Sequence, residues 1–252
     1  MAEGAASIRH ILLTRFNVQT FAKLPAPDKE WLQHRMDIFE AVCFPSVANQ
    51  TNQDFSWIIF VDIETPLSIL QRLATLQGRR PFEIRFLSHF DEIEVQREIH
   101  RVNGRTPYIL TTRLDNDDAI ATKYLQAVRE SIRLGGRKWL NFDRGLQLDD
   151  HGLYKTYRSS NAFISLIEEN INPITAMCIK HSHASRMAEV SHMKGEGWWL
   201  QVVHGRNLMN YIHRPSKCLP WKKAEFLSRG FCEEVVTYIG LRYAVKKECS
   251  IR

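Results

Sequence analysis

Residues 108–125 read YILTTRLDNDDAIATKYL. An apolar run ends abruptly in Asp-Asn-Asp-Asp, which places three carboxylates within four residues. Carboxylates this close repel one another, so either water solvates them or a cation compensates them. The run before them is rich in apolar and β-branched residues, whereas Ile120, Tyr124 and Val128 after them recur at helical spacing. The stretch therefore predicts a buried strand, an acidic loop and a helix.

Three similar units precede this one. Strand-like runs cover residues 8–16, 55–62 and 82–87, and each is followed by a segment with apolar residues at helical spacing. Four strand-then-helix units are typical of a doubly wound, mostly parallel sheet. The fold class that the sequence predicts is therefore α/β.

The helices after the first three strands have recognisable starts. Asp28 stands at the expected N-cap of the first helix. Thr65, followed by Pro66, stands at that of the second. Asp91 and Glu94 have the spacing of a capping box before the third.

The predicted strands end in polar residues. Residues 14–17 read Thr-Arg-Phe-Asn, Asp62 ends the second strand, and residues 115–118 form the acidic loop. In a doubly wound sheet, ligands bind outside the carboxyl ends of the strands. We therefore expect Thr14, Arg15 and Asn17 to lie beside the other two segments in a ligand site.

The second half of the chain has shorter and more mixed segments. Residues 137–142 predict another strand, and residues 146–157 predict a hairpin that turns at residues 149–152. No Pro-, Ser- or Gly-rich linker separates the halves. We expect a single domain over residues 1–252, in which residues 138–252 add strands and helices to a β/α half at residues 8–137.

The composition, 44% hydrophobic and 25% charged, is that of a globular protein with a sizeable core. No window of the sequence resembles a signal peptide or reaches the ~18 apolar residues of a membrane span. The five cysteines include no C-x-x-C pair, so we expect a cytoplasmic setting without a zinc ribbon or disulfide scaffold. The net charge of +6 suits an anionic partner, but scattered basic residues do not predict nucleic-acid binding.

Three interpretations compete for Asp115, Asp117 and Asp118. The loop can be a solvated turn in which Asp118 caps the following helix. An EF-hand calcium loop needs Gly at its sixth position and Glu at its twelfth, where this chain has Ile120 and Gln126, so that interpretation fails. The third is a divalent cation that bridges the carboxylates to a diphosphate, because Mg²⁺ and Mn²⁺ prefer carboxylate and phosphate oxygens.

Four segments together resemble a known family. TRLDNDDAI at residues 112–120 is similar to the Asp-x-Asp motif of GT-A-fold glycosyltransferases, and it follows the fourth strand as in that fold. HILLTRFNV, FSWIIFVDIETP and WWLQVVHGRN also match, at residues 10–18, 55–66 and 198–207. The chain thus resembles the rhamnosyltransferases of bacterial polysaccharide synthesis over residues 8–212.

The resemblance implies roles for particular residues. Asp117 would be a direct metal ligand, and Asp115 would contact the ribose or the metal. Asp118 would share the metal or cap the helix. The cofactor would be Mn²⁺ or Mg²⁺, which acts as a Lewis acid on the leaving diphosphate. Further nucleotide contacts would come from Thr14, Arg15, Asn17, Asp62, Arg113 and Asn116.

Two residues of the second half complete the implied site. His204 follows the apolar run WWLQVV, in the place from which a late histidine reaches the metal in many GT-A enzymes. Glu196 is the nearest match to the general base, although the family of folds usually shows Glu-Asp there and this chain has Glu-Gly. A zinc site at His181, His183 and His192 is not expected, because no fixed-spacing zinc pattern is present.

The function that we expect is a metal-dependent glycosyltransferase. It would use a nucleoside-diphosphate sugar, with residues 8–137 binding the nucleotide and residues 138–252 binding a glycan or lipid-linked acceptor. Basic and aromatic residues at 214–226 have two interpretations: a solvated C-terminal segment, or, for a lipid-linked acceptor, a patch that contacts the inner face of a membrane. The alternatives are a nucleotidyltransferase, whose Gly-rich phosphate loop is missing after the first strand, and a non-enzymatic basic nucleic-acid-binding protein.

Overall fold

The computed structural model describes residues 7–19, 28–104, 106–177, 183–205, 212 and 230–249. The strands are β1 (Ile8–Arg15), β2 (Ser56–Asp62), β3 (Glu83–Leu87), β4 (Tyr108–Arg113), β5 (Ala119–Ile120), β6 (Lys138–Phe142), β7 (Arg144–Leu148), β8 (Leu153–Tyr157), β9 (Ser165–Glu169), β10 (Glu189–Met193) and β11 (Trp199–Val202). The helices are α1 (Lys29–Ile38), the π-helical η1 (Phe39–Cys43), α2 (Phe44–Ala48), α3 (Leu67–Gln77), α4 (Glu92–Asn103), α5 (Tyr124–Ser131), α6 (Ala184–Met187) and α8 (Glu233–Cys249).

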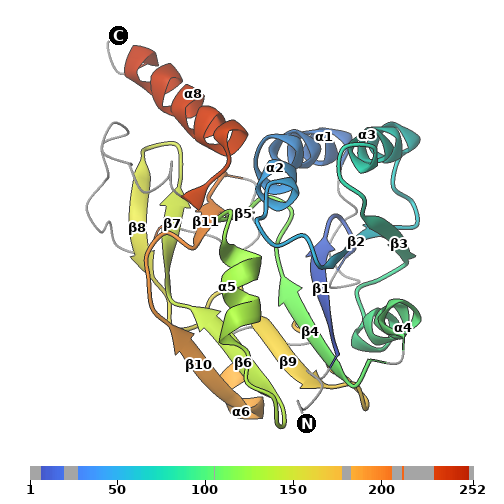
Figure 1. Ribbon diagram of the computed structural model, residues 1–252. Coiled ribbons are helices and arrows are strands. Elements are labelled where there is room, and N and C mark those ends of the chain that lie inside the picture. The colour runs from blue at the N-terminus through green and yellow to red at the C-terminus, as the bar shows by residue number, and fades with distance from the viewer. Residues whose placement is uncertain are drawn as a thin grey trace.

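The central sheet has seven strands in the order β10-β6-β9-β4-β1-β2-β3 (Figure 1). Only β9 runs against its neighbours β4 and β6, whereas every other pair in this sheet is parallel. The carboxyl ends of β1, β2, β4, β6 and β10 consequently share one edge. The predicted mostly parallel α/β sheet is confirmed.

Helices cover both faces of this sheet. One hydrophobic cluster joins α1, α3 and α5 to Leu12, Ile59 and Leu110 on one face. A second cluster joins α4 to Ile11 and Ile58 on the other face. Alternate residues of β1 and β2 thus enter opposite clusters, which is why these strands read as continuous apolar runs.

Two of the three predicted helix starts are confirmed. The carboxylate of Asp28 accepts from the backbone N–H of Trp31, and that of Asp91 accepts from Ile93 and Glu94 N–H. The third is wrong by one residue, because Pro66 is the N-cap of α3 and has extended backbone angles. The hydroxyl of Thr65 instead donates a hydrogen bond to the carbonyl of Asp62.

A second, four-stranded sheet has the order β5-β11-β7-β8. The predicted hairpin is confirmed in β7 and β8, where the Asp149 carboxylate accepts from the N–H groups of His151 and Gly152 in the turn. One prediction is wrong, because residues 119–120 form strand β5 rather than the start of a helix. Pairing of Ile120 with Trp199 on β11 outweighs its place in the helical pattern.

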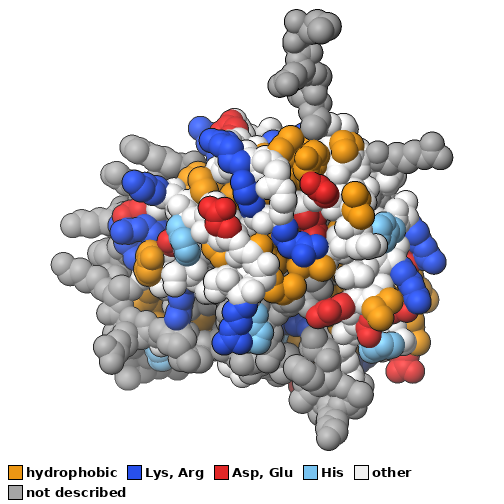
Figure 2. Space-filling model, turned by 90° about the horizontal axis from the view of Figure 1, so that it is seen from below, with side chains coloured by type: hydrophobic (Ala, Val, Ile, Leu, Met, Phe, Trp, Pro, Cys, Tyr) orange, Lys and Arg blue, Asp and Glu red, His pale blue; other side chains and the backbone are white. Residues whose placement is uncertain are grey.

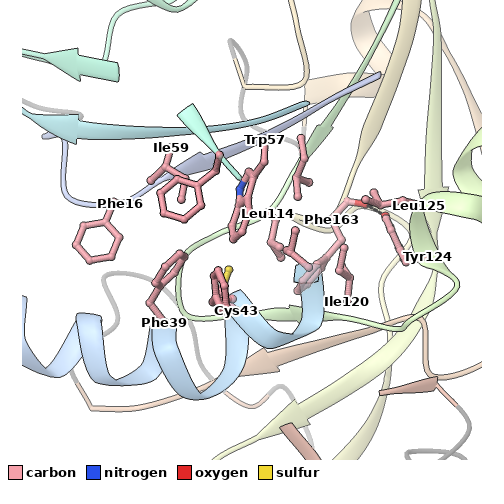
Figure 3. Packing of buried hydrophobic residues seen from close by; sticks show 14 of the residues in the cluster. Phe16, Phe39, Cys43, Trp57, Ile59, Leu114, Ile120, Tyr124, Leu125 and Phe163 are labelled. Carbon is pink, nitrogen blue, oxygen red and sulfur yellow. Dashed lines mark hydrogen bonds between the residues drawn. The ribbon is translucent and has the colours of Figure 1, made fainter. Parts of the chain in front are cut away.

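The largest hydrophobic cluster lies beneath the acidic loop (Figure 3). Trp57 packs against Phe39 and Phe44, with ring centroids 5.9 and 6.1 Å apart. Leu114, the residue before the acidic loop, is fully buried in the same cluster. The packing of Leu114 therefore anchors the loop to the core.

The buried side chain of His10, on β1, makes the stability of the fold depend on pH. Burial, and then the charge of Arg129, lowers the pKa of His10 to about 3. An unfolded histidine takes up a proton near pH 6.5, so below that value the unfolded state binds more protons than the folded state. Stability must then fall as the pH falls towards about 3. We expect His10 to cost about 2 kcal/mol of unfolding free energy between pH 7 and pH 5.

Denaturant unfolding at the two pH values measures this cost. The variant His10→Gln cannot titrate, so it should lose about 2 kcal/mol less than the wild type over that interval. His89→Gln is the matched control, because its side chain is 63% exposed and should leave the pH dependence unchanged. The same pH dependence in His10→Gln and the wild type would contradict the assignment.

The surface is mixed in charge. Figure 2 shows one face of the molecule, on which Lys and Arg side chains alternate with Asp and Glu. No helix among the described residues is long and apolar enough to cross a membrane. The basic and aromatic residues at 214–226 lie outside the described part of the chain.

Candidate functional site

The acidic loop between β4 and β5 is buried. Asp117 and Asp118 are 2% and 0% exposed, whereas the side chain of Asp115 keeps 23% of its surface. A solvated turn would need water around all three carboxylates, so that interpretation is wrong. Leu114 before the loop and β5 after it belong to the core, which draws the carboxylates inside.

Hydrogen bonds tie this loop to the end of β1. The backbone N–H of Leu114 donates to the carbonyl of Leu13 at 3.0 Å. The side-chain amide of Asn116 donates to the carbonyl of Phe16, also at 3.0 Å. Asn116 thus joins two of the predicted ligand segments, and its contact with a nucleotide stays a prediction.

Asp117 lies in a cluster with His204 and Arg35. His204 Nε2 is 3.0 Å from Asp117 Oδ2, although 87 positions separate the two residues in the chain. Arg35 on α1 donates from Nη1 to the same carboxylate oxygen, and this Nη1 lies 3.2 Å from His204 Nε2. Asp117 and His204 were both predicted to lie at the metal, and the structure brings them together.

Electrostatics keeps Asp117 ionised. Burial by itself raises the pKa of this carboxyl, but Arg35 and His204 outweigh burial and hold the pKa below its ordinary value. The guanidinium of Arg35 also lies over the Trp31 ring at 4.9 Å. The cluster therefore pairs the buried carboxylate of Asp117 with the guanidinium of Arg35.

Asp117 and His204 are the residues that would hold a divalent cation. Their 3.0 Å separation is that of a hydrogen bond, and Arg35 donates to the same Asp117 oxygen. No three His, Cys, Asp or Glu side chains of the described residues form a group that could hold a metal. Magnesium sites commonly take their other ligands from substrate phosphates and water. A cation held by Asp117 and His204 stays a prediction.

One oxygen of Asp118 is bound by the second sheet. Its Oδ1 accepts from the backbone N–H of Val202 at 2.9 Å, and α5 has its N-cap at Lys123, without a side-chain bond. The alternative that Asp118 caps the helix is therefore wrong. Burial, with Asp117 and Asp115 nearby, raises the pKa of Asp118 well above its ordinary value. The alternative that Asp118 shares the metal stays a prediction.

Asp115 forms an ion pair with Arg113 at the edge of the sheet. Arg113 Nη2 lies 3.1 Å from both oxygens of Asp115. Arg15 interacts electrostatically with Asp115, Arg113, Arg35 and Asp117, and burial is the main cause that lowers its pKa. The predicted nucleotide residues Arg15, Arg113 and Asp115 are thus neighbours of the Asp117 cluster. The prediction that Asp115 also binds the metal remains open.

The predicted residues at the ends of β1 and β2 are joined by hydrogen bonds. Asn17 Oδ1 accepts from the backbone N–H of Asp62 at 3.0 Å, and Asn17 Nδ2 donates to the hydroxyl of Thr65 at 3.0 Å. Thr14 points into the core, where its hydroxyl accepts from the indole N–H of Trp57. Thr14 is fully buried, and its contact with a nucleotide stays a prediction.

Glu196 does not lie beside the Asp117 cluster. Its carboxylate is 2.9 Å from Lys155 Nζ and 3.5 Å from Arg144 Nη1, and its side chain is 52% exposed. The chain runs from Trp198 beside Arg144 to Val203 beside Leu148, so Glu196 and His204 flank opposite ends of β11. The hydrogen bond and charge of Lys155 lower the pKa of Glu196. Its role as a general base stays a prediction.

Arg35 is a site residue that no motif in the sequence predicted. It lies on α1 between Leu32 and Met36, two residues of the buried stripe of that helix. A charged residue within an apolar stripe is a signal of a buried partner. The partner, Asp117, lies 82 positions away, so the helix alone could not identify it.

A comparison with family models matches residues 10–214, which is most of the chain. The match covers more than half of the chain, and the chain has a mostly parallel α/β fold. It belongs to the family described as "Putative rhamnosyl transferase". No curated protein matches the chain.

Solved structures show distant likeness only. S. aureus TarS 1–349 is 10% identical over 77% of this chain and 60% of that chain, with a TM-score of 0.47. Its complex with UDP-GlcNAc is 11% identical over 93% and 72% of the two chains, with a TM-score of 0.45. HddC from Yersinia pseudotuberculosis is 7% identical over 77% and 93%, with a TM-score of 0.40. This chain spans 60% of the length of the first TarS structure.

Proposed function

We propose that the protein is a glycosyltransferase that moves a sugar from a nucleoside-diphosphate donor to a hydroxyl of a glycan or glycolipid. The family description points to rhamnose as the sugar. The diphosphate is bound at the carboxyl edge of the central sheet, between the loops that follow β1 and β4. The observation that carries the proposal is the group of arginine and aspartate side chains that meet at this edge.

Three arginines and two carboxylates meet there. Arg15 interacts with Arg35 and Arg113, and with Asp115 and Asp117, so the five side chains form one electrostatic group. The three guanidinium groups provide hydrogen-bond donors and positive charge for the oxygens of a diphosphate.

Each residue has a role that its contacts support. Arg113 and Arg15 donate to the diphosphate, since guanidinium groups match phosphate oxygens in geometry. Asp115 accepts from ribose hydroxyls. Arg35 is a further donor, because its buried Nε has no hydrogen-bond partner among the described residues.

A divalent cation belongs to this proposal. Asp117 and His204 would hold Mn²⁺ or Mg²⁺, with Arg35 turned towards the phosphates. When bound, the cation supplies Lewis-acid stabilisation of the charge that develops on the leaving diphosphate. The residues of the chain orient the donor and keep water away from the buried carboxylates.

The acceptor is bound by the second half of the chain. Lipid-linked acceptors lie at a membrane surface, and the basic and aromatic residues at 214–226 suit contact with the inner face of a membrane. The protein then works in the cytoplasm at that surface. Flotation with anionic vesicles tests this part of the proposal.

Thermal unfolding with a panel of nucleoside diphosphates tests donor binding. A ligand at 100 times its Kd stabilises the folded state by about 2.7 kcal/mol, so one diphosphate should raise Tm by about 5–10 °C. The rise should be larger with Mn²⁺ than with a chelator. Nucleoside monophosphates are the control, because they lack the second phosphate. No shift with any diphosphate would contradict the proposed site.

A further inference from the structure

A second polar cluster lies on β6 and β10. His192 Nδ1 is 2.8 Å from Asp143 Oδ1, and Asn141 Nδ2 donates to the same oxygen at 2.5 Å. The side chain of Asp143 is 11% exposed, whereas that of His192 is 47% exposed. The buried carboxylate thus holds the imidazole through Nδ1 and leaves Nε2 as the nitrogen that another molecule can reach.

This cluster lies at the same edge as the diphosphate site. Because β9 is antiparallel to both β4 and β6, these two strands run in the same direction. Thr112 on β4 and Leu140 on β6 both lie opposite Ser165, so the three residues form one row across the sheet. Asp115 and Asp143 each come three residues after that row, on strands about 10 Å apart.

Arg113 of the diphosphate site shares a face of the sheet with the His192 cluster. Thr112 and Leu140, in one row, point to the same face, so the next residues, Arg113 and Asn141, point to the other. His192 lies opposite Asn141 in the register of β10 and β6, and shares its face. Arg35 reaches the same edge from α1, which covers the opposite face.

A cavity lies next to this cluster along the chain. Arg144, the residue after Asp143, lines a cavity of about 220 Å³ together with Lys155, Tyr157 and Glu196. The Tyr157 side chain is exposed beside the Arg144 guanidinium, which lies 6.0 Å from the ring. Aromatic faces and charged hydrogen-bonding groups suit an acceptor rich in hydroxyls.

We propose that His192 is the general base of the transfer and that Asp143 orients it. The proposal rests on the proposed function. The acceptor hydroxyl gives its proton to His192 Nε2 while its oxygen bonds to the anomeric carbon of the donor. The bond from that carbon to the diphosphate breaks, and its electron pair leaves on the diphosphate oxygen. Asp143 stabilises the imidazolium that forms, and direct displacement inverts the anomeric centre.

Glu196 is less suited to this step. Lys155 and Arg144 both contact its carboxylate, and Lys155 lowers its pKa. A weaker base gains less from accepting the proton in the transition state. Its place beside the cavity suits binding of acceptor hydroxyls.

Steady-state kinetics of three variants tests the proposal. His192→Ala should lower kcat by about 10²- to 10⁴-fold with little change in the KM of the donor, and added imidazole should restore part of the rate. Asp143→Asn should lower kcat on the order of 10²-fold, again without weakening donor binding. Glu196→Gln should mainly raise the KM of the acceptor. His100→Ala, at an exposed position of α4, is the matched control and should be unchanged.

The outcomes separate this proposal from the proposed function. A wild-type protein that transfers sugar from no donor overturns the proposed function. Wild-type turnover with an unchanged kcat in His192→Ala overturns the base assignment alone. A large loss of kcat in Glu196→Gln, with His192→Ala active, returns the base to Glu196.

Discussion

Replacing Asp117 by Asn should lower sugar transfer on the order of 10³-fold. Asn has nearly the same shape as Asp, so the substitution removes the negative charge with little change in packing. Without that charge the Asp117–His204 pair loses most of its affinity for a divalent cation. Initial rates over a range of Mn²⁺ concentrations measure the effect, because added Mn²⁺ should restore the chelated wild type but not the variant.

Loss of this charge also affects the fold. Arg35 and Asp117 are 12% and 3% exposed at their side chains, so the variant leaves a buried cation without its carboxylate. Breaking such a pair costs about 3–5 kcal/mol, and we expect a lower Tm. Rates are therefore measured well below the midpoint, where circular dichroism shows that the variant is folded.

A matched control makes the same chemical change elsewhere. Asp54 precedes β2, so it lies at the amino edge of the sheet, opposite the site, and it is exposed. Asp54→Asn should change neither the rate nor Tm. If Asp117→Asn, shown to be folded, retains the wild-type rate, Asp117 does not hold the cation.

Local patterns were sufficient to predict the strands and helices of the first half. Both faces of β1, β2 and β4 are covered, so each reads as an apolar run that the next residues interrupt with a cap or turn. Asp28 and Asp91 act within a few residues of their own position, and such short-range chemistry is visible in a sequence. Strand β5 is different, because two residues become a strand only by pairing with β11, about 80 positions away.

The candidate site shows the same limit. A motif and the shared edge of a parallel sheet were enough to bring Asp117, His204 and Arg15 into one region. The sequence did not show that the Arg35 guanidinium pairs with Asp117 or that Asp118 bonds to β11. Both contacts join residues more than 80 positions apart. The helical pattern around Asp118 suggested a cap, whereas the backbone N–H of Val202 offered a buried carboxyl its hydrogen bond.

Replacing Gly145 by Ala should destabilise the fold by about 3 kcal/mol or more. A Cβ at this position would lie 2.1–2.4 Å from three ring atoms of Trp199. The indole cannot move aside easily, because it stacks on Phe163 at 4.6 Å and its N–H donates to the Phe142 carbonyl at 2.6 Å. For a chain of this size, the loss corresponds to a fall in Tm of about 6–12 °C. Thermal unfolding measures it.

Two further variants show whether contact with Trp199 causes the loss. Gly78→Ala is the matched control, because its added Cβ would meet one atom at 3.4 Å and its backbone is helical, so Tm should hardly change. Trp199→Leu removes the ring and leaves a cavity, which costs stability by itself. In the double variant the new methyl group fills part of that cavity, so the loss should be smaller than the sum of the two single losses. Additive losses would mean that Gly145 is required by its backbone and not by its contact with Trp199.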